Sequence, residues 1–157
     1  MEEDLRFFLT KGDITGYKKI IDSVDINYTT KSGSSYLHYA IASSNYSEDI
    51  VIDLLKRGID INKLDSNNRS PLECCCEYNR IYIAKLLLEK GANVNSIDRW
   101  GNNPLWRAVF KRNVEMVRLL MSYGANPNNI NKAGKSPLNF AHQIEDLKMI
   151  DILLVKG

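Results

Sequence analysis

Apolar residues recur along this chain with helical spacing, in short paired segments that are separated by polar turns. Within residues 65–97, the first apolar series lies at positions i, i+3 and i+4: Leu72, Cys75 and Cys76. The second series has the same spacing: Ile83, Leu86 and Leu87. Such spacing places apolar side chains on one face of a helix, so this segment predicts two short helices. Asn79 and Arg80 interrupt the pattern between them.

Start and stop signals agree with these two helices. Ser70 is suited to cap a helix N-terminus, and Pro71 follows at the first helical position, where its missing N–H costs nothing. Gly91 follows the second helix and favours the left-handed turn that ends many helices. The segment Asp65-Ser66-Asn67-Asn68 before Ser70 predicts a β-turn, since Asp and Asn side chains bond their own backbone.

The same unit returns every 33 residues. Arg69-Ser70-Pro71-Leu72 recurs as Asn102-Asn103-Pro104-Leu105 and as Lys135-Ser136-Pro137-Leu138. Glycines follow the same period at 58, 91, 124 and 157. A period of this size is typical of stacked arrays, in which one unit alone cannot bury its apolar face. We therefore expect a binding surface rather than an enclosed active site.

The period divides the chain into five units that form a single domain, residues 1–157. The predicted boundaries are 1–29, 30–64, 65–97, 98–130 and 131–157. Unit 30–64 is two residues longer between its Leu and its Gly, and we expect the surplus near residues 43–47, between its helices. Unit 1–29 lacks the turn and the Pro-Leu phrase and is predicted to be a terminal cap. The predicted fold class is all-α.

These motifs resemble those of ankyrin repeat proteins. Ser35-Tyr36-Leu37-His38-Tyr39-Ala40 resembles the ankyrin Thr-Pro-Leu-His-x-Ala motif, and residues 90–98 resemble the Gly-Ala-Asp-Val-Asn exit of a repeat. Glu73, Trp106 and Asn139 replace the motif histidine in later units. The resemblance implies an ankyrin-repeat solenoid of about five helix-turn-helix repeats with short β-turn connections. It also implies a structural role for His38.

Composition gives little support to catalysis. The chain has 157 residues with 21 basic and 19 acidic groups, and its two histidines, His38 and His142, lie several units apart. No phosphate-binding loop, nucleophile motif or metal-ligand spacing is present, so we predict no enzyme activity, no cofactor and no metal site. No apolar segment is long enough to span a membrane. The acidic N-terminus is unlike a secretory signal, and we expect a cytoplasmic protein that is monomeric alone.

The three cysteines are consecutive, at positions 74–76. Neighbouring helical side chains diverge by about 100°, so these thiols cannot gather around one metal ion. Cys75 and Cys76 stand where ankyrin repeats place two packed alanines, and we expect both to be buried. Cys74 is expected to be accessible.

Ankyrin repeat proteins bind partners through the tips of their turns and the exposed face of their inner helices. The resemblance implies partner contacts at the matching positions here: Arg69, Tyr78, Arg99, Trp100, Asn102, Arg107, Phe110, Lys111, Lys132, Lys135 and Phe140. Trp106 is instead interpreted as a residue that fills space between units.

The charge distribution indicates the kind of partner. Unit 98–130 carries five basic groups against Asp98 and Glu115, and it holds both tryptophans, whereas unit 1–29 has a net charge of −2. Trp, Tyr and Arg are frequent anchors of interfaces. We expect another protein with an acidic surface to bind over units 65–157. A net charge of +2 and an acidic first unit argue against nucleic-acid binding.

Three functional interpretations stay open. The chain resembles small stand-alone ankyrin proteins of bacteria, some of which are immunity proteins that inhibit a cognate toxin. A host-directed effector or viral adaptor that bridges two proteins is the alternative, and nucleic-acid binding is the third. All but the last describe a non-catalytic protein–protein interaction module.

Overall fold

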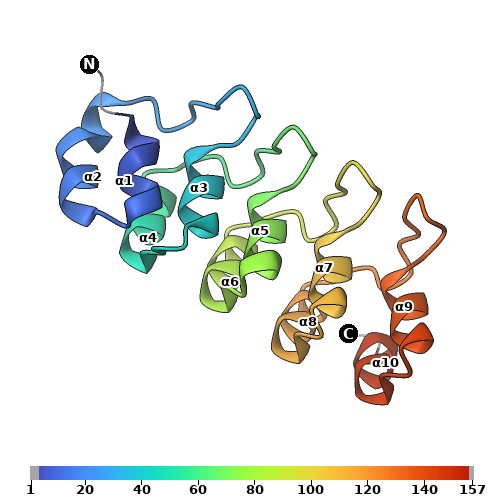
Figure 1. The fold of residues 1–157 in the computed structure, drawn as a ribbon. Helices are drawn as coiled ribbons and strands as arrows, with labels where there is room; N and C mark the ends of the chain where they lie inside the picture. Colours follow the sequence, from blue (N-terminus) through green and yellow to red (C-terminus); the bar gives the residue numbers. More distant parts are fainter. Residues whose placement is uncertain (1–3, 156–157) are drawn as a thin grey trace.

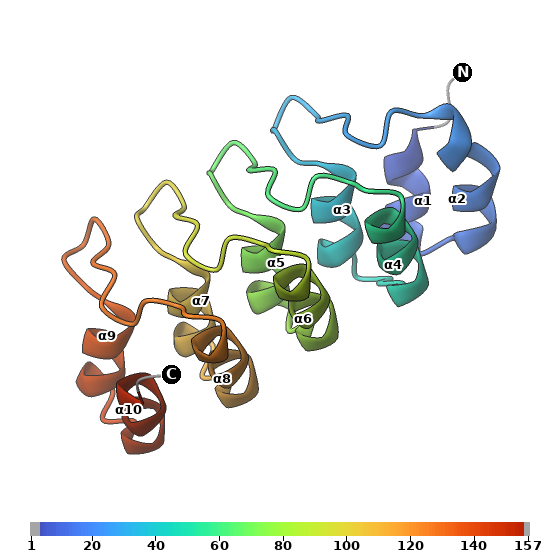
Figure 2. The same ribbon diagram turned by 180° about the vertical axis from the view of Figure 1, so that it is seen from behind.

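A computed structural model describes residues 4–155, and it shows helix pairs stacked side by side in one row. The inner helices follow one another along one side, while the outer helices line the other (Figures 1 and 2). Each inner helix contacts the next one, as does each outer helix. The inner row consists of α1 (Leu5–Lys11), α3 (Tyr36–Ala42), α5 (Pro71–Tyr78), α7 (Pro104–Phe110) and α9 (Pro137–Gln143). The outer row consists of α2 (Ile14–Ile20), α4 (Glu48–Lys56), α6 (Ile81–Glu89), α8 (Val114–Ser122) and α10 (Leu147–Leu154), and a 3₁₀ turn, η1 (Ile21–Ser23), follows α2.

The inner helices begin where the sequence signals predict. Ser70 Oγ accepts a hydrogen bond from Glu73 N at 3.2 Å, and Pro71 occupies the first turn of α5. Asn103 and Ser136 cap α7 and α9 in the same way, each before a proline. Ten α-helices within residues 4–155, with only an isolated bridge between Thr29 and Ser35, confirm the all-α solenoid.

Backbone hydrogen bonds join the turns that project from one edge of the stack. Ser66 N donates to Ser32 O at 2.9 Å, Arg99 N to Asn67 O at 2.8 Å and Lys132 N to Trp100 O at 2.9 Å. Gly101 has a φ of 82°, and a Cβ there would lie 3.1 Å from Asn131 Cα. A side chain here would strain the backbone at this positive φ and would crowd the next turn, so both the turn conformation and the close approach of successive turns favour glycine.

Asparagine side chains link the loops behind the turns. Asn27 Oδ1 accepts from Asp60 N at 2.9 Å, Asn62 Oδ1 from Asn93 N at 2.9 Å and Asn95 Oδ1 from Asn126 N at 2.8 Å. Each bond crosses from one unit to the next. These bonds fix the spacing of neighbouring units, because an amide oxygen can satisfy a backbone donor only at close range.

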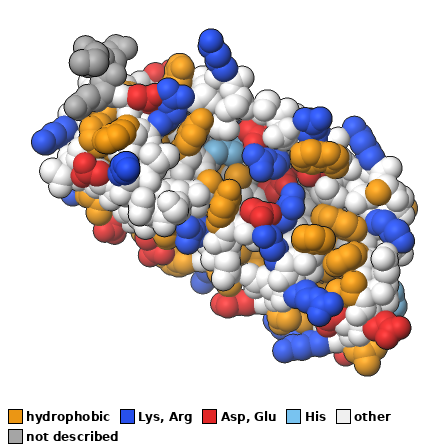
Figure 3. Space-filling model, in the orientation of Figure 1, with side chains coloured by type: hydrophobic (Ala, Val, Ile, Leu, Met, Phe, Trp, Pro, Cys, Tyr) orange, Lys and Arg blue, Asp and Glu red, His pale blue; other side chains and the backbone are white. Residues whose placement is uncertain are grey.

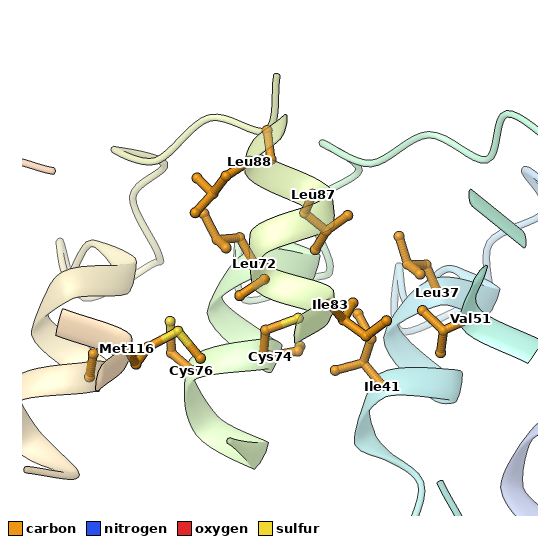
Figure 4. Close-up of a cluster of buried hydrophobic side chains, with 14 of the residues drawn as sticks. Leu37, Ile41, Val51, Leu72, Cys74, Cys76, Ile83, Leu87, Leu88 and Met116 are labelled. Atoms are coloured by element: carbon orange, nitrogen blue, oxygen red, sulfur yellow. The ribbon is translucent and has the colours of Figure 1, made fainter. Parts of the chain in front are cut away.

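The core runs through the whole stack between the two rows of helices, as the close-up in Figure 4 illustrates. Cys75 and Cys76 are buried as predicted, with Cys76 beside Met116 of the next unit (Figure 4). The prediction for Cys74 was wrong, since this residue is only 5% exposed. Its side chain points toward Ile83 and Ile41 (Figure 4), so the preceding unit covers a position that an isolated helix would expose.

The surplus residues of the second unit lie where the sequence predicted them. Residues 43–47 join α3 to α4, whereas residues 79–80 join α5 to α6. Ser43 Oγ donates to Thr10 O at 3.1 Å, and the Arg80 guanidinium donates to Ser43 O at 3.1 Å. Arg80 also lies 3.9 Å over the ring of Tyr46. The longer loop thus contacts both neighbouring units.

His38 has the structural role that the sequence motif implies. Its Nδ1 lies 2.8 Å from Ser35 Oγ and 3.2 Å from Ser35 N, and its Nε2 lies 3.0 Å from Arg69 O. The ring therefore caps α3 and bonds the turn of the next unit. Burial lowers the pKa of His38, which favours the neutral ring that these bonds require.

Candidate functional site

The predicted partner-contact residues lie on two adjoining surfaces, the turn tips and the exposed side of the inner helices. Arg69, Arg99, Trp100, Asn102, Lys132 and Lys135 belong to the turns before α5, α7 and α9. Tyr78, Arg107, Phe110 and Phe140 belong to the inner helices themselves, and Lys111 directly follows α7. The stacking of units brings these positions into rows. Within the described part of the chain, some of their side chains are exposed and unpaired, whereas others bond to groups within the protein.

Three aromatic side chains form a contiguous cluster between the fourth and fifth units; we call Trp106, Phe110 and Phe140 the aromatic cluster. The ring centroids of Trp106 and Phe140 lie 5.5 Å apart, and those of Phe110 and Phe140 lie 5.7 Å apart. Phe110 is 54% exposed, whereas the other two rings are partly buried. Apolar side chains gather over α7 and α9 on this face in Figure 3. Trp106 fills space between units, as the sequence indicated, and also forms part of the exposed apolar surface.

Beside the aromatic cluster, four charged side chains of α5, α7 and the residue after α7 form what we call the ion-pair cluster: Glu73, Glu77, Arg107 and Lys111. Arg107 Nε lies 3.1 Å from Glu77 Oε2, and Lys111 Nζ lies 2.7 Å from Glu77 Oε1. Arg107 Nη2 also donates to Glu73 Oε1 at 3.4 Å. Blue and red side chains meet over α5 and α7 in Figure 3. Two of the predicted partner-contact residues, Arg107 and Lys111, thus already pair with carboxylates of the protein itself.

Glu73 is the most perturbed acidic group of this surface. Glu73 lies on α5 at the motif-histidine position, on the side that faces the next unit. The side chain is therefore buried between the two units, and Glu73 is only 3% exposed. Burial raises the pKa of Glu73 to about 7, and the nearby charge of Asp98 acts in the same direction. Arg107 opposes this rise in the pKa but does not offset it. The sequence shows that the motif histidine is replaced, but not that the replacement has this electrostatic consequence.

The turn tips of the fourth and fifth units carry exposed aromatic and basic groups. Trp100 is 47% exposed, and the Arg99 guanidinium lies 5.0 Å from the centre of its ring. Arg99 Nη1 also donates to Asn67 Oδ1 at 2.9 Å. Lys132 and Lys135 are exposed. Within residues 4–155, none of these three cations forms an ion pair with a carboxylate.

Two of the predicted contact residues, Arg69 and Asn102, also form bonds that hold the turns together. Arg69 Nη2 lies 2.8 Å from Asp65 Oδ2 within its own turn. Asn102 Nδ2 donates to Asp98 Oδ2 at 3.2 Å, and its Oδ1 accepts from Asn131 Nδ2 at 2.8 Å. The polar atoms of Asn102 are therefore used inside the protein, and Arg69 has a carboxylate partner.

A niche of about 100 Å³ lies between the second and third units on the same face. Tyr39 and Tyr78 line it, with Cys74 and Arg69 among the other lining residues. Tyr78 is 43% exposed. The niche is large enough for one side chain of moderate size but not for a cofactor.

Residues 4–155 contain neither a metal-ligating cluster nor a membrane-spanning helix. No group of three or more His, Cys, Asp or Glu side chains that could hold a metal ion occurs within residues 4–155. No helix in that part of the chain is long and apolar enough to cross a membrane. The exposed side of the inner helices carries aromatic and charged side chains, and such a surface is suited to binding a macromolecule.

Comparison with known proteins gives the same repeat architecture. A family model described as ankyrin repeats in three copies matches residues 7–98, and one for ankyrin repeats in many copies matches residues 86–141. The chain is 45% identical over 64 residues to a putative ankyrin repeat protein, FPV230, of Fowlpox virus (strain NVSL), which covers 40% of this chain and 33% of that protein. It is also 38% identical over 63 residues to the tyrosine-protein kinase HTK16 of Hydra vulgaris, covering 40% of this chain and 8% of the kinase.

The matched part spans a third or less of each relative's length, so these two similarities concern the repeats alone. Ankyrin repeat families are generally non-catalytic binding modules. Because the first family model covers more than half of the chain, and because the helix pairs and turns recur with the same period, this chain belongs to the ankyrin repeat proteins.

Proposed function

We propose that this chain is a non-catalytic protein-binding module whose partner docks on the turn tips and inner helices of units 65–157. One observation carries the proposal: three large aromatic side chains on these units, Tyr78, Trp100 and Phe110, are between 43% and 54% exposed. Aromatic side chains that are this exposed on one face are typical of interfaces, where they act as central anchors.

The charge of the turn tips favours a partner with an acidic surface. Arg99, Lys132 and Lys135 extend the positive potential of the last two units, and no carboxylate within residues 4–155 pairs with them. Such rim charges accelerate association with an oppositely charged partner. Nucleic-acid binding is the weaker alternative, because Arg107 and Lys111 are paired with Glu77 and are therefore not free to bind phosphate.

Two biological settings would use this surface. The similarity to a viral ankyrin repeat protein supports the alternative of an adaptor that bridges two proteins. Neutralisation of a bacterial toxin would use the same face to cover an acidic toxin domain, but neither relative is bacterial. The identity of a captured partner distinguishes the two, and we expect the chain to be monomeric without it.

The test is an affinity measurement on single variants with a partner captured from cells and then purified. Trp100→Ala and Phe110→Ala should each weaken binding by roughly 2 kcal/mol, the cost typical of an anchor residue. Tyr82→Ala is a matched control, because Tyr82 is 50% exposed but belongs to the outer helix α6. Wild-type affinity in both test variants, or an equal loss in Tyr82→Ala, would overturn the proposed site.

A further inference from the structure

We infer that the partner element is an acidic peptide segment of another protein, which places one large apolar side chain on the aromatic cluster and its carboxylates against Lys132 and Lys135. The inference rests on the proposed function and specifies what that site recognises. Its basis is that, within residues 4–155, the apolar surface and the unpaired charge of the last two units lie in different places: the aromatic cluster is on the inner helices, and the unpaired lysines are on the turn of the fifth unit.

The cations of the ion-pair cluster are already occupied. Both oxygens of Glu77 are engaged, one by Arg107 and the other by Lys111. A partner carboxylate could reach these cations only by displacing Glu77, and Arg107 is only 25% exposed at its side chain. The helix surface therefore offers no free charge to an acidic partner at this point, and recognition there must come from apolar contact.

The aromatic cluster supplies that contact. Phe110 exposes 54% of its surface, and its ring is supported by Phe140 at 5.7 Å, which in turn packs against Trp106 at 5.5 Å. Rings that pack on one another are held in place, so binding an apolar side chain over them costs little side-chain entropy. In Figure 3, apolar side chains gather over α7 and α9, beside the mixed charges over α5.

The turn of the fifth unit supplies the free charge. Turns of the third and fourth units contain Asp65 and Asp98, whereas Asn131 occupies the same position in the fifth. This turn therefore carries Lys132 and Lys135 without a carboxylate of its own. Both lysines are exposed and form no ion pair within the described residues. Charge complementarity points to carboxylates on the part of the ligand that lies near this turn.

The experiment uses the intact chain and a random peptide library displayed on phage. Selected peptides should combine one Leu, Phe or Trp with at least about two Asp or Glu residues. A synthetic selected peptide is then measured by fluorescence anisotropy against the variants. Phe110→Ala should weaken binding about tenfold or more at every salt concentration. The double variant Lys132→Gln and Lys135→Gln should weaken it several-fold and reduce its salt dependence.

Two matched controls stand outside the proposed surface. Tyr82→Ala removes an exposed aromatic ring from α6, and Arg118→Gln removes an exposed cation from α8. Both should bind the peptide with unchanged affinity. Thermal unfolding by circular dichroism identifies any variant that has lost its fold. If Phe110→Ala has done so, Phe110→Gln replaces it, because Gln keeps a long side chain on α7 but removes the apolar ring, and it should weaken binding in the same way.

The outcomes separate this inference from the proposed function. Selected peptides without acidic residues would overturn the inference, and so would peptides that bind Phe110→Ala as tightly as the wild type. If the binding of these peptides still depends on Trp100, the proposed function is retained and only the inference is wrong. Failure to enrich any peptide would also overturn it, while a folded partner could still satisfy the proposed function. If the controls weaken binding as much as the test variants, both are wrong. Equal competition by single-stranded DNA would mean nucleic-acid binding and would contradict both.

Discussion

Replacing the buried carboxyl of Glu73 should make the protein more stable at alkaline pH. Glu73 is 3% exposed, and burial raises its pKa from the usual 4.5 to about 7. Ionisation of this group in the folded state is therefore costly, although Arg107 lies 3.4 Å away. The variant Glu73→Gln keeps the size and polarity of the side chain but removes the ionisation.

The sign and size follow from proton linkage. Because the pKa is higher in the folded state than in the unfolded one, the folded protein holds this proton more tightly. The contribution of Glu73 to stability is complete below the unfolded pKa and is lost as the pH rises through the folded pKa. A tenfold change in proton affinity corresponds to about 1.4 kcal/mol, so the full loss is on the order of 3 kcal/mol. Between about pH 5 and pH 8.5 we expect a loss of about 2–3 kcal/mol.

The assay is urea unfolding of the wild type and of Glu73→Gln at both pH values. The difference between the two proteins should be small near pH 5, and the variant should be more stable by about 2–3 kcal/mol near pH 8.5. Glu89→Gln is the control, since Glu89 is 45% exposed at its side chain and lies 3.8 Å from Lys85. Its effect should stay below about 1 kcal/mol at both pH values.

The comparison cancels the contributions of all other titrating groups, which are present in both proteins. A difference between the wild type and Glu73→Gln that stays constant with pH would refute the reasoning. It would mean that the Glu73 carboxyl remains hydrated in the folded state, and hence that the third and fourth units do not enclose it.

Three further predictions concern the stack itself. Native protein should react slowly with thiol reagents at all three cysteines, because burial raises the pKa of Cys74 to about 12 and Cys75 and Cys76 are even less exposed. Cys76→Arg should lower the free energy of unfolding, measured in urea, by roughly 3 kcal/mol or more. Arg112 has a φ of 54°, a left-handed conformation that is strained for any residue with a Cβ, so Arg112→Gly should raise the free energy of unfolding by about 0.5 kcal/mol. Arg118→Gly within α8 should instead lower the free energy of unfolding by about 1 kcal/mol, because glycine disfavours a helix. His38→Ala should cost about 2 kcal/mol, because Ser35 and the carbonyl of the next turn lose their partner; an unchanged urea midpoint would contradict this role.

The repeat frame could be predicted from the sequence because its signals are local. Ser70 and Pro71 begin α5, Gly91 follows α6, and the apolar spacing between them predicts both helices. A helix cap, a proline or a left-handed glycine determines the backbone conformation only within a few residues. Each of these signals recurs at 33-residue intervals along the chain, so the same two helices are predicted in successive units. The candidate surface, including Trp100 and Phe110, followed from the resemblance to ankyrin repeat proteins, because their partner-binding positions could be matched unit by unit.

The contacts that Glu77 and Cys74 make with neighbouring units were decided by the tertiary structure alone. Glu77 pairs with Arg107 and Lys111 of the next unit, which converts two predicted binding residues into partners of an internal charge. Cys74 is buried because the preceding unit covers it, although an isolated helix would expose it. A helical period gives the direction of a side chain on its own helix. The distance and rotation between neighbouring helices determine what that side chain meets, and these depend on how the units pack.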